Sequence, residues 1–163
     1  MRVALVTIAR FAVSKSMGDS VNEIRRLAVS FLARREYGAR ELENKLVDKG
    51  FSRDEVAQEM NYLREMGWQS DQRFAESLLH SRVSSGYGPY RIENELLVKG
   101  VDSSLVHALL RECGVDWLEQ ARRSRIHRFG NQISSDRLVR QKQQRYLLYK
   151  GFSLEQIKEA LNE

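Results

Sequence analysis

The feature that most constrains the fold of this chain is an internal repeat, marked by a Lys-Gly pair that occurs three times. Alignment at this pair brings together LENKLVDKGFSRDEVAQEM (42–60), IENELLVKGVDSSLVHALL (92–110) and QQRYLLYKGFSLEQIKEAL (143–161). Two equivalent apolar positions of the repeat are occupied by Leu46, Leu96 and Leu147 and by Val56, Val106 and Ile157. A unit of about fifty residues is marginally stable alone, so the units are expected to stack end to end and share buried surface.

Within each aligned segment the pattern predicts a helix, a glycine turn and a second helix. Leu42 and Leu46 are four residues apart, so they share one face of the first helix. The glycine of the Lys-Gly pair can adopt the left-handed conformation that ends a helix. The second helix is then expected to begin after a capping residue, which is Ser52, Asp102 or Ser153. In the first and third units, Glu55 and Gln156 complete capping boxes.

A third helix is expected before each of these pairs, which makes three helices per unit and about nine in the chain. The apolar stripes that predict it include Ile24 and Ala28, Phe74 and Leu78, and Leu118, Ala121, Ile126 and Phe129. The predicted fold is therefore all-α, an elongated tandem array of three three-helix repeats. Its expected parts are an N-terminal arm at 1–20, repeats at 21–69 and 70–117, and a basic repeat at 118–163. We expect the arm to be a loosely held, disordered segment or an extra helix.

The third unit departs from the other two in its middle helix. This helix is expected to begin near Ser134 or Ser135, and Gln143 stands where the other units have Leu42 and Ile92. Its sequence, RLVRQKQQRYLLYK, is more polar and more basic than its counterparts. We interpret this difference as a sign that one side of the helix meets a partner rather than a core.

The segment GYGPYRIENELLVKG (86–100) raises the question of a phosphate-binding loop, because it combines glycines with the chain's only proline. Such a loop usually follows a strand and leads into a helix, often with Gly-Lys-Ser/Thr. No strand is predicted here, and Lys99 and Gly100 lie at the far end of the helix. Gly88 suits the N-cap and Pro89 the first helical position, where its missing N–H costs nothing. We therefore interpret the segment as a helix start.

The residues that most often carry chemistry are sparse. The single cysteine, Cys113, excludes an internal disulfide, and the three histidines show no ligand spacing. No nucleophile motif is present, and no apolar run approaches the roughly 20 residues of a membrane span. Glu41 with Lys45, and Glu95 with Lys99, are spaced for surface ion pairs along a helix. We expect a cytoplasmic, non-membrane protein without catalytic, cofactor-binding or metal-binding residues.

The charge distribution points to an anionic partner, either nucleic acid or an acidic protein surface. The net charge is +5, and between residues 120 and 150 Asp136 is the one acid. The basic residues there are Arg122, Arg123, Arg125, Arg128, Arg137, Arg140, Lys142, Arg145 and Lys150. Tyr146 and Tyr149 are interleaved with them, a combination suited to phosphate contact and stacking, although Tyr146 suits a core position equally well.

Weaker candidates for the same contact surface lie earlier in the chain. They are Arg34, Arg35, Arg82, Tyr87 and Arg91, with Tyr90 beside them. Trp68 and Trp117 each lie near the end of a unit. We expect these two tryptophans to pack between units rather than to bind a ligand.

Residues 21–163 resemble the bacterial RecX regulatory family. The resemblance is carried by GYGPYRIENELLVKG, by LARREYGARELENKLVDKGF before it, by SDQRFAES, and by RYLLYKGFSLEQIKEAL near the C-terminal end. It implies a tandem array of three-helix units and a non-enzymatic modulator of the RecA recombinase. Members of this family are understood to lodge in the groove of the RecA filament on single-stranded DNA and to limit its growth or promote its disassembly. The family has no strict catalytic or ligand residue set to transfer.

Three hypotheses follow from the sequence, of which the third, a nucleotide-using enzyme, predicts ATP binding by the isolated protein, and we expect none. In the first, a monomer binds the RecA filament and reduces ATP hydrolysis, strand exchange and SOS co-protease activity. In the second, the chain binds single- or double-stranded DNA directly, because capped helix pairs with a basic helix also resemble helix-turn-helix modules.

Overall fold

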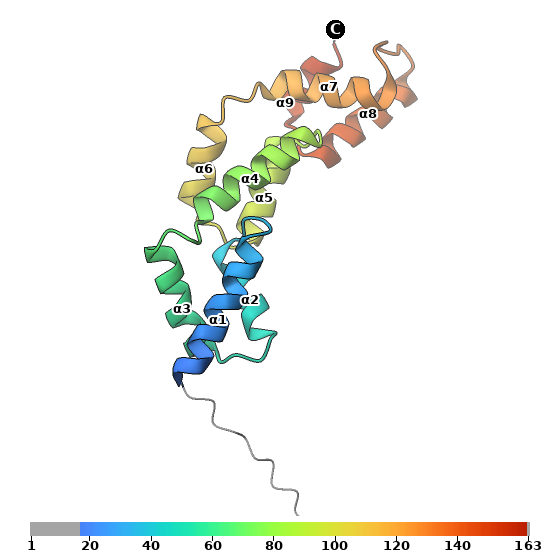
Figure 1. Ribbon diagram of the computed structural model, residues 1–163. Coiled ribbons are helices and arrows are strands. Elements are labelled where there is room, and N and C mark those ends of the chain that lie inside the picture. Colours follow the sequence, from blue (N-terminus) through green and yellow to red (C-terminus); the bar gives the residue numbers. More distant parts are fainter. Residues whose placement is uncertain (1–16, 163) are drawn as a thin grey trace, which may run out of the picture.

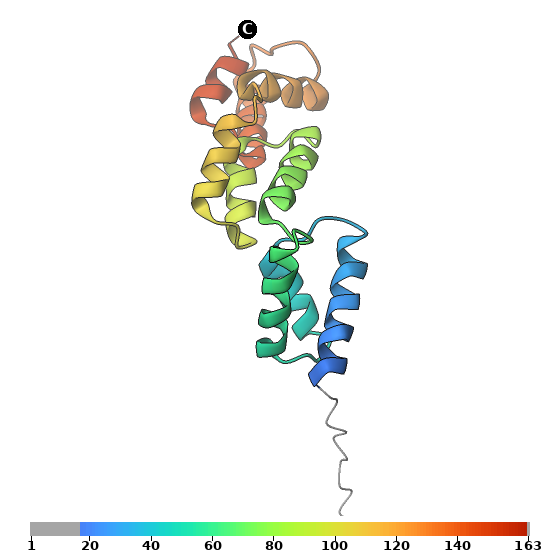
Figure 2. The ribbon, with the colours of Figure 1, turned by 60° about the vertical axis from the view of Figure 1, so that its left-hand side comes forward.

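The structure, a computed structural model, describes residues 17–162 and folds them into nine α-helices without a strand (Figure 1). The first unit contains α1 (Met17–Leu32), α2 (Ala39–Val47) and α3 (Arg53–Glu65); the second contains α4 (Asp71–Ser84), α5 (Pro89–Val98) and α6 (Ser103–Glu112); the third contains α7 (Trp117–Phe129), α8 (Arg137–Lys150) and α9 (Leu154–Ala160). The units follow one another along an elongated molecule (Figure 2), which confirms the predicted array. The arm expected over 1–20 lies mostly outside the described residues, and residues 17–20 belong to α1.

The helix ends follow the predicted local signals, with one exception. Ser52 and Ser153 form complete capping boxes, Asp102 caps α6, and Gly88 and Pro89 begin α5. The exception is α8, which was expected to begin near Ser134 or Ser135. Its cap is Asp136, whose carboxylate accepts a hydrogen bond from the Leu138 amide and whose charge suits the positive end of the helix dipole.

Each unit has its own hydrophobic core. The cores contain Ile24, Leu42, Leu46, Val56, Met60 and Leu63 in the first unit, Phe74, Leu78, Ile92, Leu96 and Val106 in the second, and Ala121, Leu147, Phe152, Ile157 and Leu161 in the third. The aligned positions of the repeat are therefore core positions in all three units. Stability within a unit comes from burying the shared apolar face of its helices.

Gln143 corrects the interpretation of α8. Its side chain is 1% exposed, so it occupies the core position of Leu42 and Ile92 rather than a surface that meets a partner. Its buried amide oxygen has no hydrogen-bond partner among the described residues. Arg125 on α7 is also buried, at 4% exposure, and its Nε lacks a partner there. The third core therefore contains two buried polar side chains, each with an atom that lacks a hydrogen-bond partner among the described residues.

Replacing Gln143 with leucine should raise the free energy of unfolding. A buried polar atom without a hydrogen bond costs about 1–3 kcal/mol, and leucine restores the apolar residue type of the repeat, so a gain of about that size is expected. Urea denaturation followed by circular dichroism measures it. The reciprocal Leu42→Gln variant should lose stability, and a destabilised Gln143→Leu variant would contradict the assignment.

The units are joined through the ends of their middle helices. Gly100, after α5, lies against Arg40 at the start of α2, and Gly151, after α8, lies against Arg91 at the start of α5. At the second junction the Gly88 N–H donates to the Lys150 carbonyl (2.8 Å), and the Tyr90 N–H donates to the Gly151 carbonyl (3.1 Å). Amides left free at the start of α5 thus meet carbonyls left free at the end of α8.

The two tryptophans differ in their positions. Trp117 packs against the core of the second unit although it begins α7 of the third, as expected for a residue between units. Trp68 does not pack between units. It contacts Tyr62 edge to face, with ring centroids 6.0 Å apart, and stays partly exposed beside Val29 and Leu32 of the first unit.

Candidate functional site

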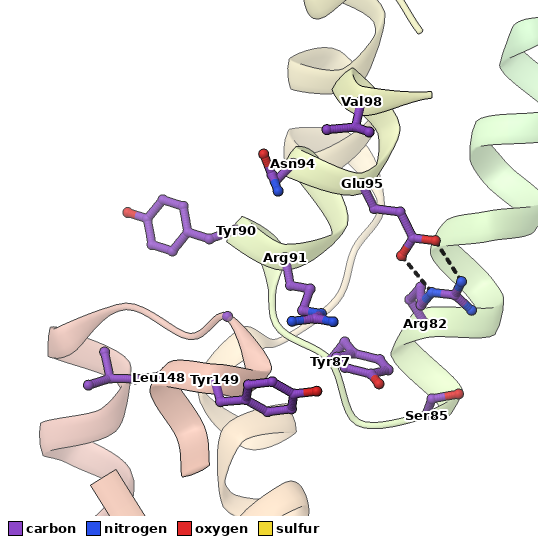
Figure 3. A pocket seen from close by; sticks show the side chains of 11 residues that line it. Arg82, Ser85, Tyr87, Tyr90, Arg91, Asn94, Glu95, Val98, Leu148 and Tyr149 are labelled. Atoms are coloured by element: carbon purple, nitrogen blue, oxygen red, sulfur yellow. Dashed lines mark hydrogen bonds and ion pairs between the residues drawn. The ribbon is translucent and has the colours of Figure 1, made fainter. Parts of the chain in front are cut away.

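A groove of about 860 Å³ lies at the junction of the second and third units (Figure 3). Its walls come from the end of α4, the length of α5 and the end of α8. The side chains that define it are Arg82, Tyr87, Tyr90, Arg91, Leu148 and Tyr149. Several basic and aromatic residues that the sequence places far apart are therefore brought together here.

The local fold of the GYGP segment builds one wall of this groove. Gly88 is buried, and a Cβ atom at this position would lie 2.5 Å from the Gly151 carbonyl oxygen. The absence of a side chain lets the start of α5 approach the end of α8 closely enough for the two hydrogen bonds of the junction. The segment is a helix start, as predicted, and it is also the contact that holds the third unit.

Arg91 lies between two aromatic rings of the groove (Figure 3). The carbon at the centre of its guanidinium lies 5.3 Å from the ring centroid of Tyr87 and 4.8 Å from that of Tyr149. The Lys150 Nζ lies 4.0 Å from the ring centroid of Tyr87 and donates a hydrogen bond to the Ser85 carbonyl. These cation–π contacts hold the cations and rings in fixed positions.

Arg82 is paired with Glu95 by two hydrogen bonds. The Arg82 Nε and Nη2 donate to the two carboxylate oxygens at 2.7 Å and 2.6 Å. These bonds hold the pKa of the Glu95 carboxyl below its ordinary value, against the opposing effect of burial. The carboxylate therefore stays charged at neutral pH and neutralises Arg82.

The acids at the junctions take partners other than those expected from helix spacing. Glu95 was expected to pair with Lys99, and Glu41 with Lys45. Instead Glu41 pairs with Arg35, whose guanidinium also lies 3.6 Å from the ring centroid of Tyr37. Tertiary contact brings an arginine to each acid, and a bidentate arginine is the stronger partner.

A second, smaller hollow of about 300 Å³ shares Arg82 with the groove and continues toward the first unit. It is lined in part by Arg35, Phe74 and Lys99. The candidates Arg35, Arg82, Tyr87 and Arg91 thus border two adjoining hollows, and Lys150 contacts Tyr87 without lining either. Arg34 is exposed after the end of α1 and lines neither of them.

The remaining basic candidates lie on α7 and α8 and do not form one uniform surface. Arg128, Arg137, Lys142 and Arg145 are exposed, and none of them forms an ion pair with a carboxylate of the described residues. Arg123 pairs with Glu119, Arg140 donates to the Leu161 carbonyl, and Arg122 is half-buried. Arg125 is buried, which corrects its expected place on the surface.

Arg125 was expected at the surface because the sequence interpretation assigned the wrong face of the α7 helix to the core. The sequence interpretation placed Ile126 on the inward stripe, whereas the structure exposes Ile126 and buries Ala121, Ser124 and Arg125. Tyr146 is half-buried and packs edge to face against Phe129, which answers the open question of its position in favour of the core.

The sequence interpretation did not single out Val98 and Leu148, which also line the groove. Both are large apolar residues that lie off the buried stripe of their helix and are exposed. An apolar residue on the solvent face of a predicted helix is a weak signal by itself, because single exposed apolar residues are common.

Other classes of site find no support in the part of the chain that the structure describes. Within residues 17–162, no group of three or more His, Cys, Asp or Glu side chains is arranged to hold a metal ion. No helix in the same range is long and apolar enough to cross a membrane.

Comparisons with known proteins give consistent matches along the chain. Family models match residues 25–63 as the first three-helix domain of RecX, 70–110 as the second and 115–161 as the third. "Regulatory protein RecX" of Pseudomonas fluorescens Pf-5 is 39% identical over 144 residues, covering 88% of this chain and 93% of that protein. The protein of the same name from Legionella pneumophila strain Corby is 39% identical over 136 residues, covering 83% and 91%.

Solved structures show the same fold. The crystal structure of RecX from Lactobacillus salivarius superimposes with a TM-score of 0.75 at 23% sequence identity, covering 88% of this chain and 96% of that one. A second crystal structure, of a regulatory protein RecX, gives a TM-score of 0.76 at 22% identity.

Proposed function

This chain belongs to the RecX family of regulatory proteins, and on that premise we propose that it binds the RecA filament on single-stranded DNA and limits its growth or promotes its disassembly. The expected consequences are less ATP hydrolysis, less strand exchange and less SOS co-protease activity. We place the protein in the cytoplasm as a monomer. Its regulatory family and helical repeat favour a non-enzymatic role.

The main support for this proposal is that the junction groove and the adjoining hollow follow one another along the array. The groove and the adjoining hollow span the junctions between all three units and contain Arg35, Arg82 and Arg91 with Tyr87 and Tyr149. Arginine and tyrosine are among the residue types that dominate the binding energy of protein interfaces. Because they follow one another along an elongated protein, they suit an elongated partner.

A RecA ATPase assay on single-stranded DNA tests the proposal. Sub-stoichiometric amounts of the protein should reduce the steady-state rate of ATP hydrolysis and of strand exchange, because a ligand that blocks growth at one point affects many subunits. Equal mass of an unrelated basic protein is the control for charge alone. Unchanged ATPase and strand exchange would overturn the proposal.

Direct binding to nucleic acid is the second candidate function. The observation that favours it is the exposed set of Arg128, Arg137, Lys142 and Arg145 on α7 and α8, whose charges are not paired with carboxylates of the described residues. Such binding should be tight without RecA and should weaken steeply with salt, because phosphate contacts release counterions. Fluorescence anisotropy with a labelled oligothymidylate at two salt concentrations measures it.

A further inference from the structure

The junction groove is lined by four exposed apolar or aromatic side chains. Tyr90, Val98, Leu148 and Tyr149 are between 44% and 68% exposed, and all four line the same hollow. Figure 3 shows Tyr90 projecting from α5 away from Arg91, and Tyr149 reaching from α8 below Arg91 toward Tyr87, with Leu148 beside Tyr149. A cluster of large exposed apolar side chains in one hollow is typical of a binding surface.

The charges of the groove are largely satisfied within the protein. Arg82 is paired with Glu95, and Lys150 is held by the Ser85 carbonyl and the Tyr87 ring. Arg91 contacts the rings of Tyr87 and Tyr149 and forms no ion pair with a carboxylate of the described residues, although its charge contributes to lowering the pKa of Glu95. A nucleic-acid strand in this groove would therefore meet few available cations.

The balance between exposed apolar side chains and unpaired charges is different on α7 and α8. There, Arg128, Lys142 and Arg145 are exposed cations without a carboxylate partner among the described residues, which is the arrangement that attracts phosphate, although Arg137 shares a hollow with Leu154 and Ile157. In the groove, four exposed apolar or aromatic side chains surround one exposed cation that has no carboxylate partner among the described residues. Tyrosine and arginine at the centre of a partly apolar hollow are typical of the residues that dominate protein–protein binding.

We propose that the junction groove docks a protein segment in which an aromatic or aliphatic side chain stands next to a carboxylate. The apolar side chain lies against Tyr90, Leu148 and Tyr149, and the carboxylate receives hydrogen bonds from Arg91, whose fork matches it in geometry. The inference rests on the proposed function. In it, the groove contacts the protein surface of the filament, and the exposed charges of α7 and α8 contact the phosphates of the DNA.

Binding to the RecA filament tests the inference. The double variant Tyr90→Ala/Tyr149→Ala should bind the RecA filament, formed on oligothymidylate with ATPγS, about 10- to 100-fold more weakly than the unaltered protein. Arg91→Glu should weaken it similarly, by placing a carboxylate against the incoming carboxylate. Binding to oligothymidylate alone should change less than about twofold in both variants, because the phosphate contacts lie elsewhere.

Two control variants separate contact from folding. Tyr149→Phe keeps the ring and should bind the filament as the unaltered protein does. Met66→Ala removes an equally exposed apolar side chain from the first unit, outside the groove, and should have no effect. The altered positions are exposed, so circular dichroism should show intact folding. Unweakened filament binding by the folded double variant would overturn the inference, and so would a larger loss on free oligothymidylate than on the filament.

A second measurement does not depend on RecA, and it decides the matter if the unaltered protein fails to bind the filament. The peptide N-acetyl-Asp-Leu-Asp-Phe-amide, titrated into ¹⁵N-labelled protein, should shift the amide signals of Arg91 and Tyr149 in a saturable way. The double variant should show no such shifts. Shifts of the groove signals without filament binding would overturn the RecA proposal and support the groove as a protein-docking site. Absence of shifts there would overturn the docking inference.

Discussion

Gly151→Ala is expected to lower the free energy of unfolding by about 2–5 kcal/mol, whereas Gly50→Ala at the equivalent position should lower it by about 1–2 kcal/mol. Both glycines end the middle helix of their unit with a positive φ, +91° and +97°. A side chain is strained in this conformation at either position. The two sites differ in what a new Cβ atom would meet.

At Gly151 the added Cβ would lie 2.5 Å from the Arg91 backbone nitrogen and Cβ, whereas at Gly50 nothing lies within 4 Å. The excess loss at Gly151 therefore measures the close approach of the second and third units. Urea denaturation of both variants, followed by circular dichroism, gives the two values. Equal losses would mean that the junction accommodates the side chain and that its close packing contributes little to stability.

The second large effect is expected from reversing the exposed charges of α7 and α8. The triple variant Arg128→Glu/Lys142→Glu/Arg145→Glu should bind the RecA filament on single-stranded DNA about 10- to 100-fold more weakly at physiological salt. Each reversal removes an attraction to phosphate and adds a repulsion from it, which together weaken the free energy of binding by about 1 kcal/mol per side chain. The fold should persist, because the three side chains are exposed and form no ion pair with a carboxylate of the described residues.

The structure guides the choice of these three positions. Arg123 and Arg140 are engaged by Glu119 and by the Leu161 carbonyl, so reversing either would disturb the fold as well as the surface. Arg125 is buried, and a carboxylate there would be an uncompensated buried charge. Arg128, Lys142 and Arg145 avoid both problems.

A matched variant controls for net charge. Arg26→Glu/Lys49→Glu/Arg53→Glu changes the charge by the same amount at exposed positions of the first unit, away from α7 and α8. Filament binding should be measured for both variants between low and physiological salt. If three phosphate contacts are lost, the slope of log affinity against log salt should fall by about 2 for single-stranded DNA. Equal weakening by the two variants would show a general effect of charge and contradict a specific surface.

The fold was predictable because its signals repeat and act over short distances along the chain. Ser52, Asp102 and Ser153 cap their helices as predicted, and Leu46, Leu96 and Leu147 are buried as the alignment requires. A cap involves residues two or three apart, and a buried stripe follows the 3.6-residue period of the helix. A signal found in one unit could therefore be checked at the equivalent position of the other two.

The weakest predictions concerned the third unit, where the pattern is less regular. Gln143 suggested a surface position because its side chain is polar, and Arg125 suggested a contact residue for the same reason. Both are buried. Residue type predicts burial only on average, and neighbouring helices decide which face of α7 and α8 lies inside.

The sequence by itself determined the helices of the described residues, most of their ends, the aligned core positions and the family resemblance, because each of these depends on residues close together in the chain or on the repeat. Only the tertiary structure decided which charges are available and where the groove lies. The contacts that form it join residues about sixty positions apart, such as Gly88 with Lys150 and Ser85 with Lys150. No local pattern encodes such a pairing, because it depends on the angle at which one three-helix unit meets the next.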